Sequence, residues 1–542
     1  MAAMHKLALL IALPLASTIA LGQGQPAPNL VLLNGRVFTV SDSAPWGEAL
    51  AIAGDRITAV GSTVDVRALA DNETRVIDLA GRLVVPGFND AHVHPGAYPD
   101  GEDLGGPPAM EHDPTLTEIL DRLKAAVARA PKGGWIFGEI GAAVLDDPKA
   151  TRFALDAIAS DHRVMLVAWT GHGTLFNTAA LRHLGVQEDA PDPPGGSYRR
   201  LPGSRTISGV AHEYAEYRLH QRLVAELPAD KQPAAIRDFA HGAASLGITS
   251  AQAMLTAFTH EEAVQLLARQ ELPVRLRLID FPLVAMGEWR ASLRPAPSPR
   301  LAVSGTKWIL DGTPIERRMW LREPYADRPT RGEPNYSAGE LRQFLTRARA
   351  AGEQPMVHAV GDAAIDAVLE GLDQGGGEAW RLLRPRIEHG DLLRPDQFAR
   401  ARRLGVVLVQ NPSHFMIPDV MRARLGHSRA AQVSAVKSSL AAGIPLAFGS
   451  DGPLNPFLNL MFAVTNANNP AEALTLEQAV SAYTRGSAFA EFQEQEKGTL
   501  AVGMLADLAV LSQDIFKVPV EALPATTSVL TIVGGRIVHE AQ

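Results

Sequence analysis

The sequence contains no cysteine among its 542 residues. Disulfide bonds, thiolate nucleophiles, iron–sulfur clusters and cysteine-bound zinc are therefore excluded. The chain also lacks a basic excess, because 51 lysines and arginines stand against 59 acidic residues and give a formal net charge of -8. A general nucleic-acid-binding protein is usually basic, so we expect no nucleic-acid partner. Hydrophobic residues make up 46% and charged residues 20%, which is typical of a globular protein and excludes a disordered chain or a simple coiled coil.

Long hydrophobic runs are equally scarce. The apolar run Leu7 to Leu21 follows His5-Lys6, is interrupted by Pro14, and falls short of the roughly 18–20 residues that cross a bilayer. The small residues that end it suit a signal-peptidase site. We therefore expect a signal peptide over residues 1–22, an exported protein that is periplasmic or secreted, and no stable membrane insertion after signal removal. An uncleaved membrane anchor is the alternative.

Both ends of the remaining chain have a sequence pattern typical of short strands, with short apolar runs separated by turns. In residues 23–85, Leu30 to Leu33 is followed by Asn34-Gly35, which is a hairpin-type turn signal. In residues 496–542, Asp507 to Leu511 and Ile532 to Val538 are again short apolar runs. The two ends are expected to form one small β domain that brackets everything between them.

The middle of the chain, residues 86–495, alternates short apolar runs with helical stretches. This alternation predicts an α/β fold with a parallel sheet, and a (β/α)8 barrel is its leading form. Residues from about 100 to 235 fit the alternation less well and contain the loop Pro191 to Gly196. We interpret that region as a large insertion that covers one face of the barrel. The barrel strand candidates are Val274–Ile279, Thr306–Leu310, Gln354–His358, Arg386–His389, Val406–Gln410 and Ile444–Gly449.

The segment Pro86 to His94 carries the first chemical signal. In an extended segment, residues two apart point the same way, so His92 and His94 can both reach one metal ion. Imidazole suits zinc, iron, nickel or manganese, and the pair by itself does not fix the metal. A bare His-x-His is a weak signal, because it is more often a surface or core feature.

Four further residues lie at or near predicted strand ends: Lys307, His358, His389 and Asp451. Each of them taken singly is more simply explained by a structural role, as a packed histidine, an aspartate in a turn or a lysine on the surface. Their joint placement changes this, because the active sites of (β/α)8 enzymes gather at the carboxyl ends of the strands. Together with the His-x-His pair they are expected to converge on one site.

This order of residues resembles the amidohydrolase superfamily of metal-dependent hydrolases. The closer similarity is to amidohydrolase family 3, the YtcJ-like and N-substituted formamide deformylase-like branch. The similarity covers nearly the whole chain after the N-terminal segment. Its matching segments are Pro86–His94, His172 with Asn177–Leu181, Leu246–Thr249, Lys307–Thr313, Val357–Asp362, Arg386–His389 and Phe448–Asp451.

The resemblance implies a distorted (β/α)8 TIM-like barrel with a β-sandwich built from both chain ends, and a site with two divalent metal ions, of which zinc is favoured. By that resemblance His92 and His94 bind the more buried ion, and His358 and His389 bind the second. Lys307 bridges both after CO2 has carboxylated its amine, since an ammonium beside two dications is disfavoured and a carbamate offers anionic oxygens. Asp451 contacts the metal and holds the bridging water.

The same resemblance implies the chemistry. Asp451 accepts the proton of a water that attacks a carbonyl carbon, and then returns it to the leaving nitrogen. The metals lower the pKa of that water and stabilise the oxyanion. The expected reaction is cleavage of a carbon–nitrogen bond in a non-peptide amide, an N-acyl amine or an N-formyl amine. The products are a carboxylate and an amine.

Three residues are predicted around the small-molecule substrate: His172 in the insertion, His414 after a strand, and Asp311 beside the Lys307 strand, which can also act by holding the Lys307 loop. The chain departs from the family pattern in two places. Residues 314–320 replace a glycine- and alanine-rich stretch, and Glu139 replaces an expected glycine. Both changes lie where the substrate should be recognised.

Two other functions stay open. The first is another reaction on the same metals, either deamination of a ring or hydrolysis of a lactone or ester. The second is a metal-free scaffold that keeps the barrel for binding or assembly, although proteins of that kind lose ligand residues and this chain retains all six. Dimers are common in similar proteins, so a homodimer is one expectation for the assembly.

Overall fold

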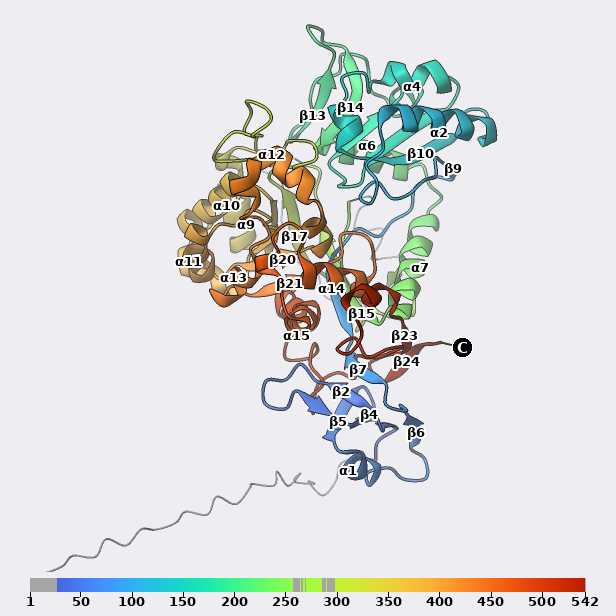
Figure 1. The fold of residues 1–542 in the computed structure, drawn as a ribbon, viewed down its shortest axis with the longest axis vertical. Coiled ribbons are helices and arrows are strands. Elements are labelled where there is room, and N and C mark those ends of the chain that lie inside the picture. Colours follow the sequence, from blue (N-terminus) through green and yellow to red (C-terminus); the bar gives the residue numbers. More distant parts are fainter. Residues whose placement is uncertain are drawn as a thin grey trace, which may run out of the picture.

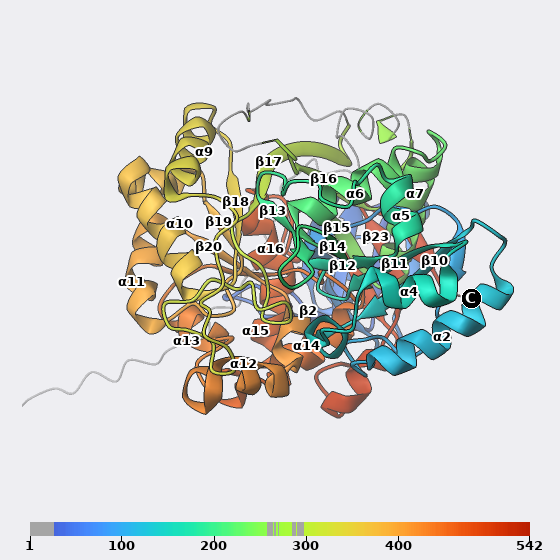
Figure 2. The ribbon, with the colours of Figure 1, turned by 90° about the horizontal axis from the view of Figure 1, so that it is seen from above.

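A computed structural model describes residues 27–541 apart from 257–263, 265–266, 269, 285–288 and 290–297. The predicted signal peptide lies outside the described residues. At the centre of the fold is an eight-stranded parallel sheet in the order β21-β20-β19-β18-β17-β16-β15-β8. Its end strands β21 and β8 also lie next to each other, so the sheet is a nearly closed barrel (Figure 2). The strands are β8 (Phe88–Val93), β15 (Ile248–Met254), β16 (Arg275–Asp280), β17 (Leu301–Ile309), β18 (Pro355–Ala359), β19 (Arg386–His389), β20 (Val407–Gln410) and β21 (Leu446–Phe448).

Helices cover the outside of this barrel (Figures 1 and 2). Helix α9 shows why they form: Ser337 and Glu340 make a capping box at its start, and Leu341, Phe344 and Leu345 form a buried stripe. Such a stripe packs against the sheet and leaves the charged side in water. The outer helices include α7 (Lys231–Ser245), α9 (Ala338–Ala350), α10 (Asp362–Gly375), α11 (Pro395–Leu404), α12 (Pro418–Ala430), α13 (Val436–Ala441), α14 (Pro456–Thr465), α15 (Leu476–Ser481) and α16 (Ser487–Ala490).

Two sheets at the lower end of Figure 1 combine both ends of the chain. One has the order β5-β4-β1-β6, and the other has the order β24-β23-β22-β7-β2-β3. In the second sheet β7 pairs antiparallel with β22, so residues more than 400 positions apart are neighbours. The strands are β1 (Leu30–Leu33), β2 (Arg36–Phe38), β3 (Trp46–Gly47), β4 (Ala49–Ala53), β5 (Arg56–Gly61), β6 (Arg75–Asp78), β7 (Leu83–Pro86), β22 (Leu508–Leu511), β23 (Ser528–Val533) and β24 (Arg536–Glu540).

The insertion is an α/β unit with its own six-stranded sheet, in the order β13-β14-β12-β11-β10-β9 (Figure 1). It has its own buried apolar core, which includes Ile119, Leu123, Val164 and Leu166. The sequence predicted an insertion here but not this sheet. Its elements are β9 (Gly101–Asp103), α2 (Leu116–Arg129), β10 (Trp135–Ile140), α3 (Ala142–Asp146), α4 (Arg152–Ala159), β11 (Arg163–Ala168), β12 (Gly173–Phe176), α5 (Thr178–His183), β13 (Gly196–Arg200) and β14 (Ile207–Glu213), after which α6 (Tyr214–Val224) leads back to the barrel.

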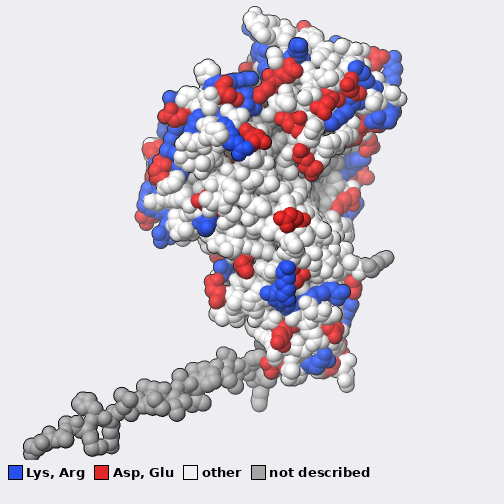
Figure 3. Space-filling view, viewed as in Figure 1, with Lys and Arg blue, Asp and Glu red and all other residues white. Residues whose placement is uncertain are grey.

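The predicted fold class, a TIM-like α/β barrel with a β domain from both chain ends and a large insertion, is confirmed. Acidic and basic side chains are interspersed over the insertion and the outer helices on the face shown in Figure 3. No helix within the described part of the chain is both long and apolar enough to cross a membrane.

Candidate metal centre and active site

The six residues that the sequence singled out lie together at the carboxyl ends of the barrel strands. His92 is in β8 and His94 follows it, Lys307 is in β17, and His358 and His389 lie near or at the ends of β18 and β19. His92 contacts two of the others, since its Nε2 lies 3.1 Å from Nζ of Lys307 and 3.1 Å from Nε2 of His94. Parallel strands therefore bring these side chains to one point, as the strand-end argument requires.

Asp451, three residues after β21, lies in the middle of the imidazoles. Its Oδ1 is 3.3 Å from Nε2 of His94 and 3.8 Å from Nε2 of His92. Its Oδ2 is 3.8 Å from Nδ1 of His389 and 3.8 Å from Nε2 of His414. The backbone of Asp451 has a left-handed φ of 50°, and its N–H donates to the carbonyl oxygen of His92 at 2.9 Å. This bond fixes the loop after β21 against β8.

His358 is buried beside the same cluster. Its ring centre is 4.4 Å from that of His389 and 4.5 Å from that of His172. Its Nε2 is a buried atom without a hydrogen-bond partner among the described residues, and the nearest carboxylate oxygen, Oδ1 of Asp311, is 3.9 Å away. A buried, unpartnered imidazole nitrogen is costly unless something binds it.

Two groups of side chains here could each hold a metal ion. One is His92, His94 and Asp451, and the other is His389, His414 and Asp451. Nitrogen and carboxylate donors of this kind suit zinc, manganese, iron or nickel. The residues therefore fit the divalent ions that the sequence implied. The second group differs from the predicted set, because it contains His414, which was expected to contact substrate, in place of His358.

Burial changes the pKa values of the cluster in the direction that metal binding needs. Burial, with nearby cations, lowers the pKa of His92, His358 and His389 well below the usual value, and lowers that of His94 to about 3. Neutral imidazole is the form that binds metal. Burial also lowers the pKa of Lys307 to about 8, which makes its neutral amine accessible near neutral pH.

Oxygen atoms behind the histidines, which the sequence interpretation missed, hold their Nδ1 atoms. Nδ1 of His92 is 2.6 Å from Oε2 of Glu388, Nδ1 of His389 is 2.8 Å from Oδ1 of Asn411, and Nδ1 of His414 is 3.1 Å from Oδ2 of Asp391. Such partners orient the rings, and in His92 and His414 they leave Nε2 facing the site. The available signal for Glu388 was its position in a strand expected to be buried, where a charged residue needs a reason.

Asp311 lies behind His358 and is fully buried. Its carboxylate accepts hydrogen bonds from the backbone N–H groups of Trp320, Val360 and Gly361 at 2.8, 2.9 and 2.9 Å. Burial raises its pKa to about 8, against the opposite effect of these bonds. The side chain thus ties the segment after β17 to the loop after β18. Its observed contacts are those of a residue that holds the site's loops.

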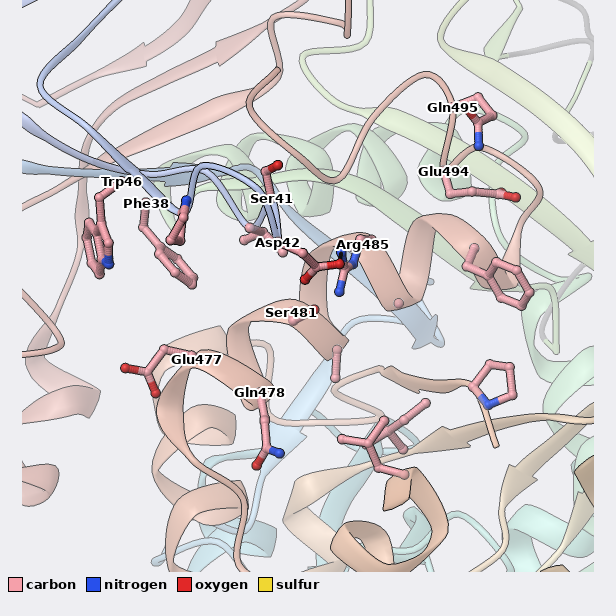
Figure 4. A pocket seen from close by; sticks show the side chains of 18 residues that line it. Phe38, Ser41, Asp42, Trp46, Glu477, Gln478, Ser481, Arg485, Glu494 and Gln495 are labelled. Atoms are coloured by element: carbon pink, nitrogen blue, oxygen red, sulfur yellow. Dashed lines mark hydrogen bonds and ion pairs between the residues drawn. The ribbon is translucent and has the colours of Figure 1, made fainter. Parts of the chain in front are cut away.

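A cavity of about 800 Å³ lies at the other end of the barrel, between the β domain and the helices α15 and α16 (Figure 4). Leu446, which begins β21, lines it, whereas Asp451 follows the far end of the same strand. Phe38 and Trp46 supply an apolar wall, and an ion pair between Asp42 and Arg485 spans 3.0 Å beside it. These side chains belong to neither group of candidate metal ligands, so this cavity is separate from the candidate active site.

The amidohydrolase family profile matches residues 75–539, which span the barrel, the insertion and, in the β domain, the strands from β6 onward. The chain belongs to the amidohydrolase family. It is a metal-dependent hydrolase that acts on carbon–nitrogen bonds other than peptide bonds.

Similar proteins agree with this membership. The chain is 30% identical to Protein LONG AFTER FAR-RED 3 of Arabidopsis thaliana, over 94% of this amidohydrolase and 91% of that protein. It is 27% identical to the putative amidohydrolase YtcJ of Bacillus subtilis, over 93% and 98%, and 27% identical to the N-substituted formamide deformylase of Arthrobacter pascens, over 90% and 94%. The crystal structure of an uncharacterized metal-dependent hydrolase from Pyrococcus furiosus has 25% identity and a TM-score of 0.65, and covers 90% of this chain and 100% of its own.

Proposed function

We propose that this amidohydrolase cleaves the carbon–nitrogen bond of an N-acyl or N-formyl amine, with Asp451 as general base and then general acid. The observation that carries the proposal is the position of Asp451, whose two carboxylate oxygens lie within 3.3 to 3.8 Å of ring nitrogens of His92, His94, His389 and His414. The likeness to an N-substituted formamide deformylase supports the choice of an N-formyl or N-acyl substrate.

Two divalent ions, with zinc favoured, are part of the proposal. His92, His94 and Asp451 would hold one ion, and His389 with His358 or His414 would hold the second. Lys307, carboxylated by CO2, would bridge them. When bound, divalent ions supply positive charge that polarises a carbonyl group and lowers the pKa of water.

Asp451 does the proton transfer in this mechanism. Burial raises its pKa above the usual value of a carboxyl, which makes its carboxylate a better proton acceptor. A carboxylate oxygen of Asp451 takes a proton from the attacking water as the new carbon–oxygen bond forms. The same oxygen then gives that proton to the nitrogen as the carbon–nitrogen bond breaks. The products are a carboxylate and an amine.

Glu316 connects the barrel to the insertion. It belongs to the stretch that departs from the family pattern, and its carboxylate accepts hydrogen bonds from the hydroxyls of Thr170 and Thr313. Thr170 lies in the insertion and Thr313 follows β17. The departure thus replaces a small-residue stretch by a side chain that connects the two units, and we propose that it narrows the range of accepted substrates.

The test uses protein prepared with zinc and bicarbonate, and a panel of N-formyl amines, N-acetyl amines, cyclic amides, amino-substituted rings and lactones. Release of an organic amine with uptake of zinc supports the proposal. Release of ammonia from a ring, or of an alcohol from a lactone, would replace it by one of the alternative reactions on the same metals.

The variant Asp451→Asn is expected to lower kcat at least about a hundredfold, within the range for loss of a general acid–base. Asp419→Asn, at an exposed aspartate whose side chain is 92% accessible on α12, is the matched control and should keep full activity. If Asp451→Asn retains wild-type kcat, the proton-transfer role is wrong. If the wild type binds no zinc and cleaves no panel compound, the proposed metal centre and the proposed substrate class are both wrong.

We also propose that the protein is exported, and the support is the N-terminal apolar run described above. Cell fractionation and N-terminal sequencing of the mature protein test this, with a new terminus expected near Gln23. A full-length protein retained in the membrane fraction would favour the anchor instead. Sedimentation analysis of the purified protein tests the expected homodimer.

A further inference from the structure

Glu213 is the last residue of β14 in the insertion and lies beside the candidate active site. Its side chain is completely buried, and its backbone has φ 55° and ψ -132°, a conformation that residues with side chains rarely adopt. Strained backbone of this kind persists where the surroundings fix it, and it clusters at functional sites.

The carboxylate holds His172. In the antiparallel pairing of β12 and β14, Gly173 is opposite His212, so the neighbouring residues His172 and Glu213 come together. Oε2 of Glu213 is 2.9 Å from Nδ1 of His172 and also accepts a hydrogen bond from Nδ2 of Asn335 at 3.2 Å. The bond from Asn335 joins the insertion to the segment after β17. The contact with Nδ1 fixes the rotation of the His172 ring.

The other carboxylate oxygen of Glu213, Oε1, is closely packed but makes no hydrogen bond to a described residue. The nearest cationic nitrogen is Nε of Arg318 at 3.7 Å. A Cβ atom built on Gly312 would lie 2.3 Å from this oxygen. Glycine after Asp311 is therefore what leaves room for the Glu213 carboxylate. The barrel strand that carries Lys307 and the insertion are thus fitted to each other at this side chain.

His172 in turn faces the candidate metal centre. Its ring centre is 4.5 Å from that of His358, and its side chain keeps 7% of its surface accessible. Nδ1 is occupied by Glu213, whereas Nε2 has no hydrogen bond to any residue that the structure describes. The ring therefore presents an unused nitrogen beside His358, at the junction between insertion and barrel.

We propose that Glu213 is a positioning residue that holds His172 through Nδ1, so that Nε2 of His172 contacts the substrate, and that the insertion thereby supplies one arm of the active site. The inference rests on the proposed function. Glu213 itself makes no contact with substrate in this proposal and acts only through His172. A mutation of Glu213 should therefore have an effect that depends on His172, which a purely structural role would not require.

A double-mutant cycle tests the inference in the zinc-loaded protein, with kcat and KM measured on the cleaved N-acyl or N-formyl amine. Glu213→Gln should lower kcat/KM about ten- to a hundredfold while zinc per chain stays unchanged. In the His172→Ala background the same change should alter kcat/KM by less than about twofold, because the residue through which it acts is gone. An equal loss in both backgrounds, or loss of zinc, would overturn the inference.

Glu216→Gln is the matched control. Glu216 is also completely buried, lies three residues further in α6, and accepts a hydrogen bond from Oγ1 of Thr174 at 2.7 Å, not from His172. It should keep kcat/KM within about twofold of the wild type, as expected for a residue that does not act on the reacting group. A loss equal to that of Glu213→Gln would mean that both changes merely disturb the insertion.

A spectroscopic measurement keeps the inference testable if no substrate is found. In nitrogen-15 histidine-labelled, zinc-loaded protein, the resonance of His172 is identified by its absence in His172→Ala. It should report a proton on Nδ1 in a hydrogen bond, and this signal should shift in Glu213→Gln but not in Glu216→Gln. A proton on Nε2 instead would overturn the inference. Failure of the proposed function would show separately, as a zinc-loaded wild type that cleaves none of the panel.

Discussion

Oε2 of Glu388 lies 2.6 Å from Nδ1 of His92, and both side chains are fully buried. Arg386 holds the same carboxylate, with Nε 2.6 Å from Oε1 and Nη2 2.9 Å from Oε2. The guanidinium compensates the buried negative charge, and the carboxylate accepts the Nδ1 proton of His92. Nε2 of His92 is thereby left to face Lys307 and His94, as a metal ligand would.

Glu388→Gln is therefore expected to weaken metal binding about 10- to 100-fold, because the hydrogen bond that orients His92 loses its charge. Chelator competition with zinc measures the affinity directly. Glu370→Gln, at a half-exposed glutamate on the outer helix α10, is the control and should bind zinc like the wild type. Unchanged zinc affinity in Glu388→Gln would contradict the orienting role.

Uptake of CO2 by Lys307 should depend on pH. Only the neutral amine reacts, and burial lowers the pKa of Lys307 to about 8. At a fixed concentration of dissolved CO2, the initial rate of carbamate formation in metal-free protein should rise about tenfold for each pH unit up to pH 8 and level off above it, because the rate follows the neutral fraction of the amine. Carbon-13 NMR after addition of labelled CO2 reports the carbamate. The signal should vanish in Lys307→Ala and persist in Lys437→Ala, and a signal that survives in Lys307→Ala would place the carbamate elsewhere.

His220 should make stability depend on pH. Burial lowers the pKa of His220 to about 3, so the folded protein keeps it neutral while the unfolded chain binds a proton below about 6.5. Its contribution to stability is complete above that value and is lost as the pH falls. Between pH 6.5 and 5.5, the free energy of unfolding should fall by about 1 kcal/mol more in the wild type than in His220→Gln.

Urea unfolding at the two pH values measures that difference. His427→Gln, at an exposed histidine on α12, is the matched control and should keep the wild-type pH dependence. Parallel curves for the wild type and His220→Gln would show that the buried imidazole accepts a proton in the folded state after all.

Arg424 should stabilise the attachment of the insertion to the barrel. Its side chain is 5% exposed and lies 2.9 Å from Asp146 of the insertion and 2.8 Å from Asp327 after β17. Arg424→Met should lower the free energy of unfolding by about 2 kcal/mol. This loss is smaller than the loss expected for a fully buried ion pair, because the side chains of Asp146 and Asp327 are 30% and 26% exposed. Urea unfolding measures it. Arg422→Ala is the control, because Arg422 forms an exposed ion pair with Asp419. It should lower the free energy of unfolding by less than about 0.5 kcal/mol. Equal losses in the two variants would contradict the stabilising role of Arg424.

The barrel and the convergence of the chemical residues could be predicted from the sequence because both follow from local patterns. Short apolar runs that alternate with amphipathic helices predict parallel strands, and parallel strands bring their carboxyl ends to one edge. His92 in β8 and His94 just after it are two residues apart, and their convergence needed only the period of an extended segment. The insertion was recognised as an interruption of this alternation, although its strands β9 to β14 were not.

The partners of these residues could not be predicted in the same way, since they come from distant parts of the chain. Glu388 meets His92 across 296 positions, and Asp311 meets Gly361 across 50. A strand pattern gives the face on which a side chain lies but not which neighbour it meets there. His414 is a further case, because its Nε2 lies 3.8 Å from Oδ2 of Asp451 only through the closure of β20 and β21 into the barrel.

The sequence by itself determined the type of fold and the absence of cysteine chemistry, and it predicted candidate metal ligands, because composition and periodicity are properties of the linear chain. The tertiary structure alone decided which ring nitrogen of His92 and of His414 faces the site, and that Glu213 of the insertion reaches His172 beside the barrel. Those facts depend on distances between side chains from separate elements. Such distances are fixed only when the buried core packs and most of its polar groups pair with groups from other elements.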